Sequence, residues 1–353
     1  MSFNRRTGPD GKPGFALASR HFSLAAEARP ALVTAVLLLV ALVAALVAMT
    51  IGRFPLAPLD VVAILLGQGP GGSAEQVVRH VRLPRLLTGF FVGAALGVSG
   101  ALFQSVSRNV LGSPDIIGFT TGAAAGALAQ IVLFGGVPTA VASSAVMGGL
   151  ATAALVYALS VKSGVSGGYR LVLTGIGVGA VLTAFNGLML VKGDLDDAIA
   201  ANLWLAGSLN ARTWQHVHPV MLGCLVIVPL AAFLARPLSI MEMGDDVARQ
   251  LGIRVERTRL LAVFCGVLLA SLATGSAGPV AFIALAAPQL VRRLTRSRGV
   301  PVVSAAIMGA CLLVLADLIA QAMPFQIVIP IGRMTGLVGG LYLLWLLTRA
   351  RQP

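Results

Sequence analysis

The chain has 353 residues, of which 57% are apolar and only 11% are charged, and its mean hydropathy is +0.90. Soluble domains of this length do not have such a composition, so we expect an all-α polytopic membrane protein folded as one compact bundle. The net charge of +13 does not indicate nucleic-acid binding, because the basic residues lie in short loops between apolar segments, where they set membrane topology.

Residues 1–30 are polar and basic without a cleavable signal, so we expect a disordered cytoplasmic tail before a membrane domain at 31–353. With the N-terminus in the cytoplasm, nineteen of the 26 Lys and Arg residues fall inside and seven outside, the bias expected when both termini are cytoplasmic. The domain contains ten apolar segments, the eighth of them short. They lie at 31–51, 86–106, 116–134, 139–161, 171–191, 217–235, 260–276, 278–293, 302–323 and 333–348.

Glycine recurs at four-residue spacing in three of these segments, which puts each set on one helix face and lets another helix approach closely. Packing alone explains any single glycine, but three sets together predict an unusually compact bundle. Segments two to five are weakly echoed by seven to ten, and an offset of five helices would invert the second copy. The three sets are Gly89-Gly93-Gly97, Gly118-Gly122-Gly126 and Gly332-Gly336-Gly340.

Charged groups inside the predicted spans are nearly absent, with Asp317 the clearest acid. A carrier driven by protons or sodium usually needs several such groups, so a stand-alone secondary carrier is the less favoured alternative. No phosphate-binding loop occurs, so ATP could power the protein only through a partner subunit. The three cysteines and the histidines lack metal-ligand spacing, and we expect no metal, no cofactor and no catalytic residue.

The largest internal loop, 236–259, contains the string GDDVARQLGIRVERTR. Asp245 and Asp246 precede an amphipathic run and are placed to cap a short helix, which could dock into a partner across the cytoplasmic face. A solvated loop that only satisfies topology explains the same residues equally well. On the outer side, Arg82 and Arg85 precede segment two. They either snorkel to the headgroup boundary, form a docking site for acidic residues of an external protein, or steer an anionic ligand.

From Val81 to the C-terminus, ordered blocks of this chain resemble the permease subunits of binding-protein-dependent ABC importers for iron-siderophores, haem and cobalamin. WLAGSL (204–209) resembles the external gate segment of that family, and ARQLGI (248–253) resembles its coupling helix. The remaining blocks are RLPR (82–85), 93–127, 278–294, Ala316-Asp317 and 330–347.

The resemblance implies a ten-helix subunit of the bacterial inner membrane that dimerises with a second permease around a central pathway. Two ATP-binding subunits would bind below, and a substrate-binding receptor protein would dock above. The predicted ATPase-coupling residues are Asp245, Asp246, Ala248, Arg249, Gln250, Leu251 and Gly252. The predicted receptor-docking residues are Arg53, Arg82 and Arg85, and the predicted pathway residues are Ser99, Gln104, Asn109, Thr120 and Thr121.

The ending LVGGLYLLWLL resembles permeases for catecholate siderophores of the enterobactin type. A ferric siderophore is therefore the expected substrate, with cobalamin or haem as the alternatives. Enterobactin-type systems resemble heterodimers, so the second permease is expected to be a different chain, with a second copy of this chain as the alternative. The chain departs from the family pattern at several positions. Gln289 stands where the family often has His, Gln321 where it often has Arg, and Val328 where it often has Glu; residues 109–114 also differ from the usual Asn-Pro-Leu-Ala-Asp-Pro.

Overall fold

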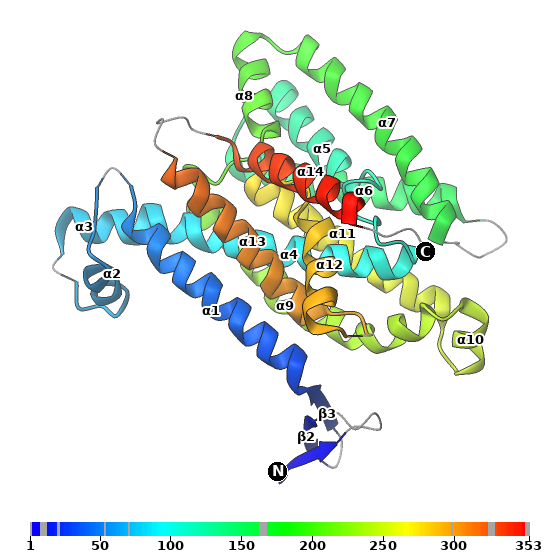
Figure 1. Cartoon of the computed structure of the whole chain (residues 1–353). Helices are drawn as coiled ribbons and strands as arrows, with labels where there is room; N and C mark the ends of the chain where they lie inside the picture. The colour runs from blue at the N-terminus through cyan, green and yellow to red at the C-terminus, as the bar shows by residue number, and fades with distance from the viewer. Residues whose placement is uncertain are drawn as a thin grey trace.

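The computed structural model describes residues 2–7, 13–19, 22–52, 54–69, 71–161, 168–297, 299–323 and 329–349. These residues form an all-α bundle, preceded by a small sheet (Figure 1). The helices are α1 (Ala28–Thr50), α2 (Pro58–Leu65), α3 (Gly72–Gln76), a π-helical turn (Val77–Arg82), α4 (Leu83–Ser107), α5 (Phe119–Phe134), α6 (Pro138–Ser160), α7 (Gly168–Lys192), α8 (Leu195–Leu205), α9 (Trp214–Met241), α10 (Asp245–Gln250), α11 (Val255–Ala277), α12 (Ile283–Thr295), α13 (Val302–Ala322) and α14 (Ile331–Arg349).

Each of the ten predicted segments contains a helix, so the sequence predicted the order of the bundle correctly. Seven helices in the described part of the chain are long and apolar enough to cross a membrane. The segments at 116–134 and 278–293 are shorter as helices than as apolar runs, because α5 has 16 residues and α12 has 13. Both of these short helices therefore begin or end inside the bundle rather than at its surface.

The segment before α1 contains strands β1 (Ser2–Thr7), β2 (Pro13–Ser19) and β3 (Phe22–Glu27), which pair as an antiparallel sheet in that order. A disordered tail was the expectation here, so the described strands differ from it. The sheet lies at one end of α1, away from the bundle (Figure 1). The division into a tail and a membrane domain stays a prediction.

The helices support the inverted repeat. In the first set, α4, α5, α6 and α7 have 25, 16, 23 and 25 residues; in the second, α11, α12, α13 and α14 have 23, 13, 21 and 19. The second member is the shortest in both. In addition, α4 packs on α13 and α11 packs on α6, so the first member of each set contacts the third member of the other. This exchange is what an inverted arrangement of two similar units produces.

Two of the glycine sets lie where helices touch backbone to backbone. A Cβ at Gly97 would lie 2.1 Å from the carbonyl oxygen of Ala305 on α13. A Cβ at Gly126 would lie 2.1 Å from the carbonyl oxygen of Ser144 on α6. The prediction of close helix approach is confirmed at these positions. The third set behaves differently, because Gly336 and Gly340 have nothing within 4 Å of a built Cβ.

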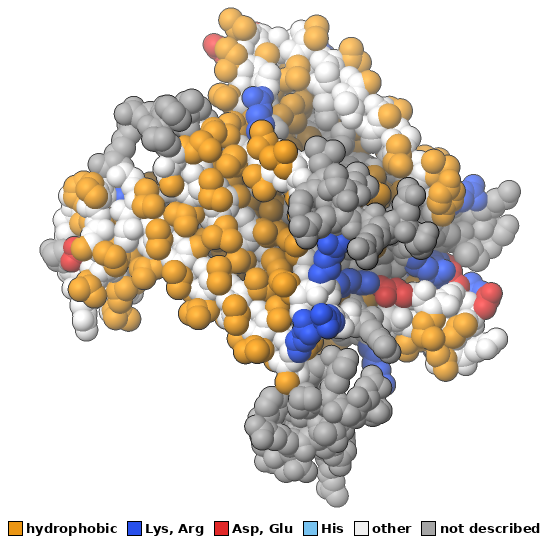
Figure 2. All heavy atoms as spheres, in the orientation of Figure 1, with side chains coloured by type: hydrophobic (Ala, Val, Ile, Leu, Met, Phe, Trp, Pro, Cys, Tyr) orange, Lys and Arg blue, Asp and Glu red, His pale blue; other side chains and the backbone are white. Residues whose placement is uncertain are grey.

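The chain has two polar ends. We call the end with α2, α3 and the start of α4 the α2 end, and the opposite one, with α10 and the end of α4, the α10 end (Figure 1). On the face shown in Figure 2, hydrophobic side chains cover the flank of the bundle, and most of the visible Lys and Arg side chains gather toward the α10 end. This distribution matches a multi-pass membrane protein whose basic side is the α10 end.

Candidate functional site

The short helix α10 is bounded by two glycines in the left-handed region, Gly244 with φ 128° and Gly252 with φ 81°. It has six residues, so Leu251 and Gly252 of the predicted coupling residues lie just beyond its end. Gly244 is the N-cap, and no side chain caps the helix, so the predicted capping by Asp245 and Asp246 is wrong. Both acids nevertheless lie in the first turn, where their charge favours the helix.

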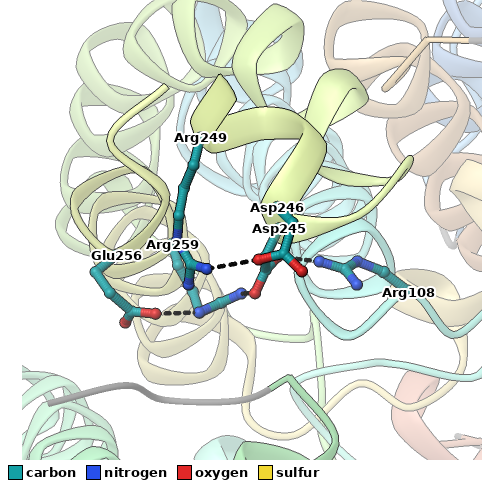
Figure 3. Close-up of polar contacts among 6 residues, drawn as sticks. All are labelled: Arg108, Asp245, Asp246, Arg249, Glu256 and Arg259. Atoms are coloured by element: carbon teal, nitrogen blue, oxygen red, sulfur yellow. Dashed lines mark hydrogen bonds and ion pairs between the residues drawn. The ribbon is translucent and has the colours of Figure 1, made fainter. Parts of the chain in front are cut away.

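Instead of capping, Asp245 connects α10 to two spanning helices (Figure 3). Its Oδ2 accepts a hydrogen bond of 2.7 Å from Nη2 of Arg259 on α11, and its Oδ1 pairs with Arg108 at the end of α4. Arg259 is only 2% exposed and also pairs with Glu256. We call these four residues, Arg108, Asp245, Glu256 and Arg259, the clamp.

The clamp keeps Asp245 ionised. Partial burial alone would raise the pKa of its carboxyl, but the hydrogen bond and charge of Arg259, with the charges of Arg108 and Arg249, outweigh burial and lower it. A buried guanidinium needs such partners, because an unpaired buried charge is strongly destabilising. The position of α10 is therefore linked to the ends of α4 and α11 by charge-assisted hydrogen bonds.

The other face of α10 is open and apolar. Met243, Val247 and Leu251 are 71%, 40% and 62% exposed, whereas Ala248 is fully buried beneath the helix. Asp246 pairs at 2.8 Å with Arg249 of the same helix, and its side chain is 90% exposed. Exposed apolar side chains on a rigidly held polar helix are typical of a protein contact rather than of a solvated loop.

At the α2 end, Arg85 and Asp317 form an ion pair with two hydrogen bonds, of 2.7 and 3.1 Å. Gln321 donates a further bond of 2.7 Å to Asp317. Arg82 donates to the main-chain carbonyls of Met49 and Phe54. Both predicted docking arginines thus already have partners within the chain, although each keeps part of its surface accessible. Arg53, the third docking prediction, lies outside the described residues.

The predicted pathway residues lie within α4, in the turn after it and in the first turn of α5. Ser99 donates to the carbonyl of Gly266 at 2.7 Å, and Gln104 donates to that of Leu285 at 3.0 Å, so both tie α4 to neighbouring helices of the same chain. Asn109 lies in the turn after α4, where its Oδ1 accepts from the N–H of Leu111. Thr120 and Thr121 begin α5, with Thr120 buried and Thr121 partly exposed. Their role in a pathway stays a prediction.

Comparison with known proteins identifies the chain. Residues 37–349 match the model of the FecCD transport family. The protein belongs to that family. It is 46% identical over 322 residues to the ferric enterobactin transport system permease protein FepG of Escherichia coli (strain K12). This match covers 90% of this chain and 96% of FepG.

A more distant relative and a solved structure agree with this assignment. The hemin transport system permease protein HmuU of Yersinia pestis is 33% identical over 282 residues, covering 77% of this chain and 83% of HmuU. A solved structure of a metal-chelate type ABC transporter in an inward-facing conformation matches with a TM-score of 0.78 at 26% identity, covering 91% of this chain and 99% of that one. The resemblance drawn from the motifs is confirmed, and the homologues are permease subunits of ABC importers.

Two of the positions at which this FecCD chain departs from the expected pattern have local partners. Gln289 donates to the carbonyl of Val110 at 2.7 Å, which ties α12 to the turn after α4, and Gln321 bonds to Asp317. Val328 lies outside the described residues. Sequence analysis missed three clamp residues: Arg108 and Arg259 counted only as topology charges, and Glu256 received no role. No local signal marks Arg108, which lies 137 positions from Asp245, whereas Glu256 and Arg259 have the i, i+3 spacing of a helical ion pair.

Proposed function

We propose that this FecCD-family chain is the permease subunit of an ATP-driven importer that passes a ferric siderophore across the bacterial inner membrane. Its α10 end faces the cytoplasm, together with both termini. The similarity to FepG over nine-tenths of the chain supports the substrate class, and a catecholate siderophore fits it best. The chain itself performs no chemistry.

The observation that carries the proposal is the exposed apolar face of α10, a helix that the clamp holds against α4 and α11. Two ATP-binding subunits would bind at the α10 end, one on this chain and one on its partner permease. Met243, Val247 and Leu251 would insert into the ATPase, while Gln250 and Gly252 shape the end of the helix. Because Asp245 joins α10 to α4 and α11, movement of the ATPase would be passed directly to helices of the bundle.

A second permease subunit, of a different chain, would cover the exposed faces of α7 and α14. On α7, Val181, Leu188 and Val191 are 70%, 65% and 85% exposed, and Gly177 has open space beside it. On α14, Gly336 and Gly340 are likewise open. Lipid covers apolar side chains in general, but glycines along an open face favour a closely packed helix as the neighbour. The pathway would run between the two permeases.

A substrate-binding receptor would dock on the α2 end. Arg82 and Arg85 remain the proposed contacts, with Arg53 beside them in the sequence. Because Arg85 is paired with Asp317, a receptor carboxylate would have to share or displace that partner. Arg85 would then hold the receptor only in the docked state, while Asp317 would keep the arginine in position before docking.

The test is uptake of radio-iron supplied as a ferric catecholate, in cells with and without this gene, with labelled cobalamin and haem alongside. We expect loss of iron uptake alone, restored by the wild-type gene. Loss of cobalamin or haem uptake in its place would leave the fold and refute the substrate.

A further inference from the structure

Among the described Lys and Arg side chains at the α2 end, two have no partner, whereas the others are hydrogen-bonded or ion-paired. Arg79 forms an ion pair of 2.8 Å with Glu75, Arg212 donates to the carbonyl of Ser208 at 2.9 Å, and Arg82 and Arg85 are bound as described above. Among the described residues of that end, Lys192 and Arg333 have neither an ion pair nor a side-chain hydrogen bond. Both are exposed.

The backbone next to Arg333 is held by close contacts with two other segments. Arg333 follows Pro330 and Gly332 in the first turn of α14, where three segments, 204–209, 277–279 and 330–332, meet backbone to backbone. The N–H of Ser208 donates to the carbonyl of Ala277 at 2.8 Å. A Cβ at Gly332 would lie 2.4 Å from the carbonyl oxygen of Pro279 and 2.6 Å from that of Ala206, so no larger residue fits there. We call this contact the three-segment junction. The close packing of this junction fixes the backbone position from which the Arg333 side chain extends.

The open face of α14 continues from Arg333. Residues 333, 336, 337, 340 and 341 lie on one side of the helix by their spacing, and Leu337 and Leu341 are 63% and 61% exposed. Thr335, on the opposite side, is 3% exposed. Under the proposed function this open side meets the second permease, and the pathway runs between the two. Arg333 then lies at the outer mouth of that pathway.

We propose that Arg333 is a binding residue for the anionic iron chelate as it leaves the receptor and enters the pathway. The proposal rests on the proposed function and adds to it a substrate contact on this chain. A ferric catecholate is an anion, because its deprotonated oxygens carry more charge than Fe³⁺ neutralises. A guanidinium without an internal partner offers such a ligand several N–H donors in one plane. At a partly dehydrated mouth this attraction exceeds its value in water.

Lys192 provides a matched control. It is also exposed, unpartnered and at the α2 end, in the last turn of α7. Three acids follow it closely, Asp194, Asp196 and Asp197. These acids balance its charge, so we do not expect it to hold an anion.

The experiment compares Arg333→Gln, Arg333→Lys and Lys192→Gln in the complete importer, reconstituted with its ATPase and second permease in liposomes. Uptake of a ferric catecholate is measured against the concentration of loaded receptor, at several salt concentrations. We expect Arg333→Gln to lower the maximal rate about tenfold with an unchanged half-saturating receptor concentration, because the loss follows docking. The salt dependence of the rate should weaken, since one attraction has been removed. Arg333→Lys should recover part of the rate, and Lys192→Gln should match the wild type.

The outcomes separate this inference from the function on which it rests. If the wild-type complex fails to import any ferric siderophore, the proposed function fails. If the wild type imports and Arg333→Gln behaves like Lys192→Gln, the arginine only contacts headgroups or water and the inference is overturned. Loss of the second permease from purified Arg333→Gln complexes would also overturn it, because Arg333 would then be a subunit contact.

Discussion

Arg85 and Asp317, 232 positions apart in the sequence, form an ion pair with two hydrogen bonds that joins the first turn of α4 to the part of α13 at the α2 end. The Asp317 side chain is 7% exposed and that of Arg85 is 25% exposed. The family motifs around these residues, RLPR and Ala-Asp, are therefore two halves of one contact. Their first task is to hold two helices together, and any docking role is added to it.

Removing either partner should destabilise the chain by about 1–3 kcal/mol, because the remaining charge is left partly buried and unpaired. The double variant Arg85→Met/Asp317→Leu should lose less than the sum of the two single variants. Thermal unfolding in detergent measures all three. The exposed pair Arg79–Glu75 is the control, and Glu75→Gln should change stability by less than about 0.5 kcal/mol. Strict additivity of Arg85→Met and Asp317→Leu would show that the pair does not act as a unit.

Asp245→Asn should uncouple ATP hydrolysis from transport, because it weakens the bonds from α10 to Arg108 and Arg259 and leaves the apolar face of the helix intact. We expect the ATPase to co-purify normally and to hydrolyse ATP, with uptake per ATP reduced at least several-fold. Asp246→Asn is the control at the neighbouring position, because among the described residues its carboxylate bonds only Arg249 of the same helix. Equal uptake in the two variants would contradict the role of the clamp.

Leu251→Asp should act differently, since it places a charge on the face that meets the ATPase. Burying that unpaired carboxylate in the contact would cost several kcal/mol, so the ATPase should no longer co-purify. Asp245→Asn and Leu251→Asp thus separate transmission from binding. Normal co-purification with Leu251→Asp would remove α10 from the proposed interface.

The clamp also predicts a pH dependence. Because the pKa of Asp245 is lowered in the folded chain, its contribution is complete above the ordinary carboxyl range and is lost as the pH falls through the lowered pKa. A spin label on Val247→Cys should therefore show constant mobility from pH 8 to about pH 4 and greater mobility at lower pH. The native cysteines are buried, so the label should react at the new site. In an Asp245→Asn background the label should be mobile throughout, and a change between pH 5 and 7 would contradict this account.

The glycines separate internal packing from subunit contact. Gly97→Ala puts a methyl group against the carbonyl of Ala305 and should cost about 1–3 kcal/mol or more by forcing α4 from α13. Gly336→Leu enters open space, so the isolated subunit should keep its stability. The same variant should lose the second permease in pull-down. Retention of that subunit would mean that another face of the chain forms the permease contact.

Much of the architecture could be predicted from the sequence because membrane helices are specified locally. Apolar length predicted the ten helices, and four-residue spacing predicted the close contacts of Gly97 and Gly126. Periodicity left α10 open between a helix and a solvated loop, and the resemblance of residues 248–253 to a coupling helix indicated the helix. What could not be predicted were contacts between distant segments. The sequence predicted that Asp245 caps its own helix, but in the folded chain its carboxylate forms ion pairs with Arg108 and Arg259. Likewise, nothing local shows that Arg85 is paired while Arg333 is not.

The most direct test of the central claim is transport by purified components in liposomes. The permease pair, the ATPase and the loaded receptor are reconstituted, and accumulation of radio-iron as a ferric catecholate is followed with ATP and, separately, with an imposed proton gradient. This account predicts accumulation that requires both ATP and the ATPase. Accumulation by the permease alone, driven by the proton gradient, would contradict it and establish a stand-alone carrier.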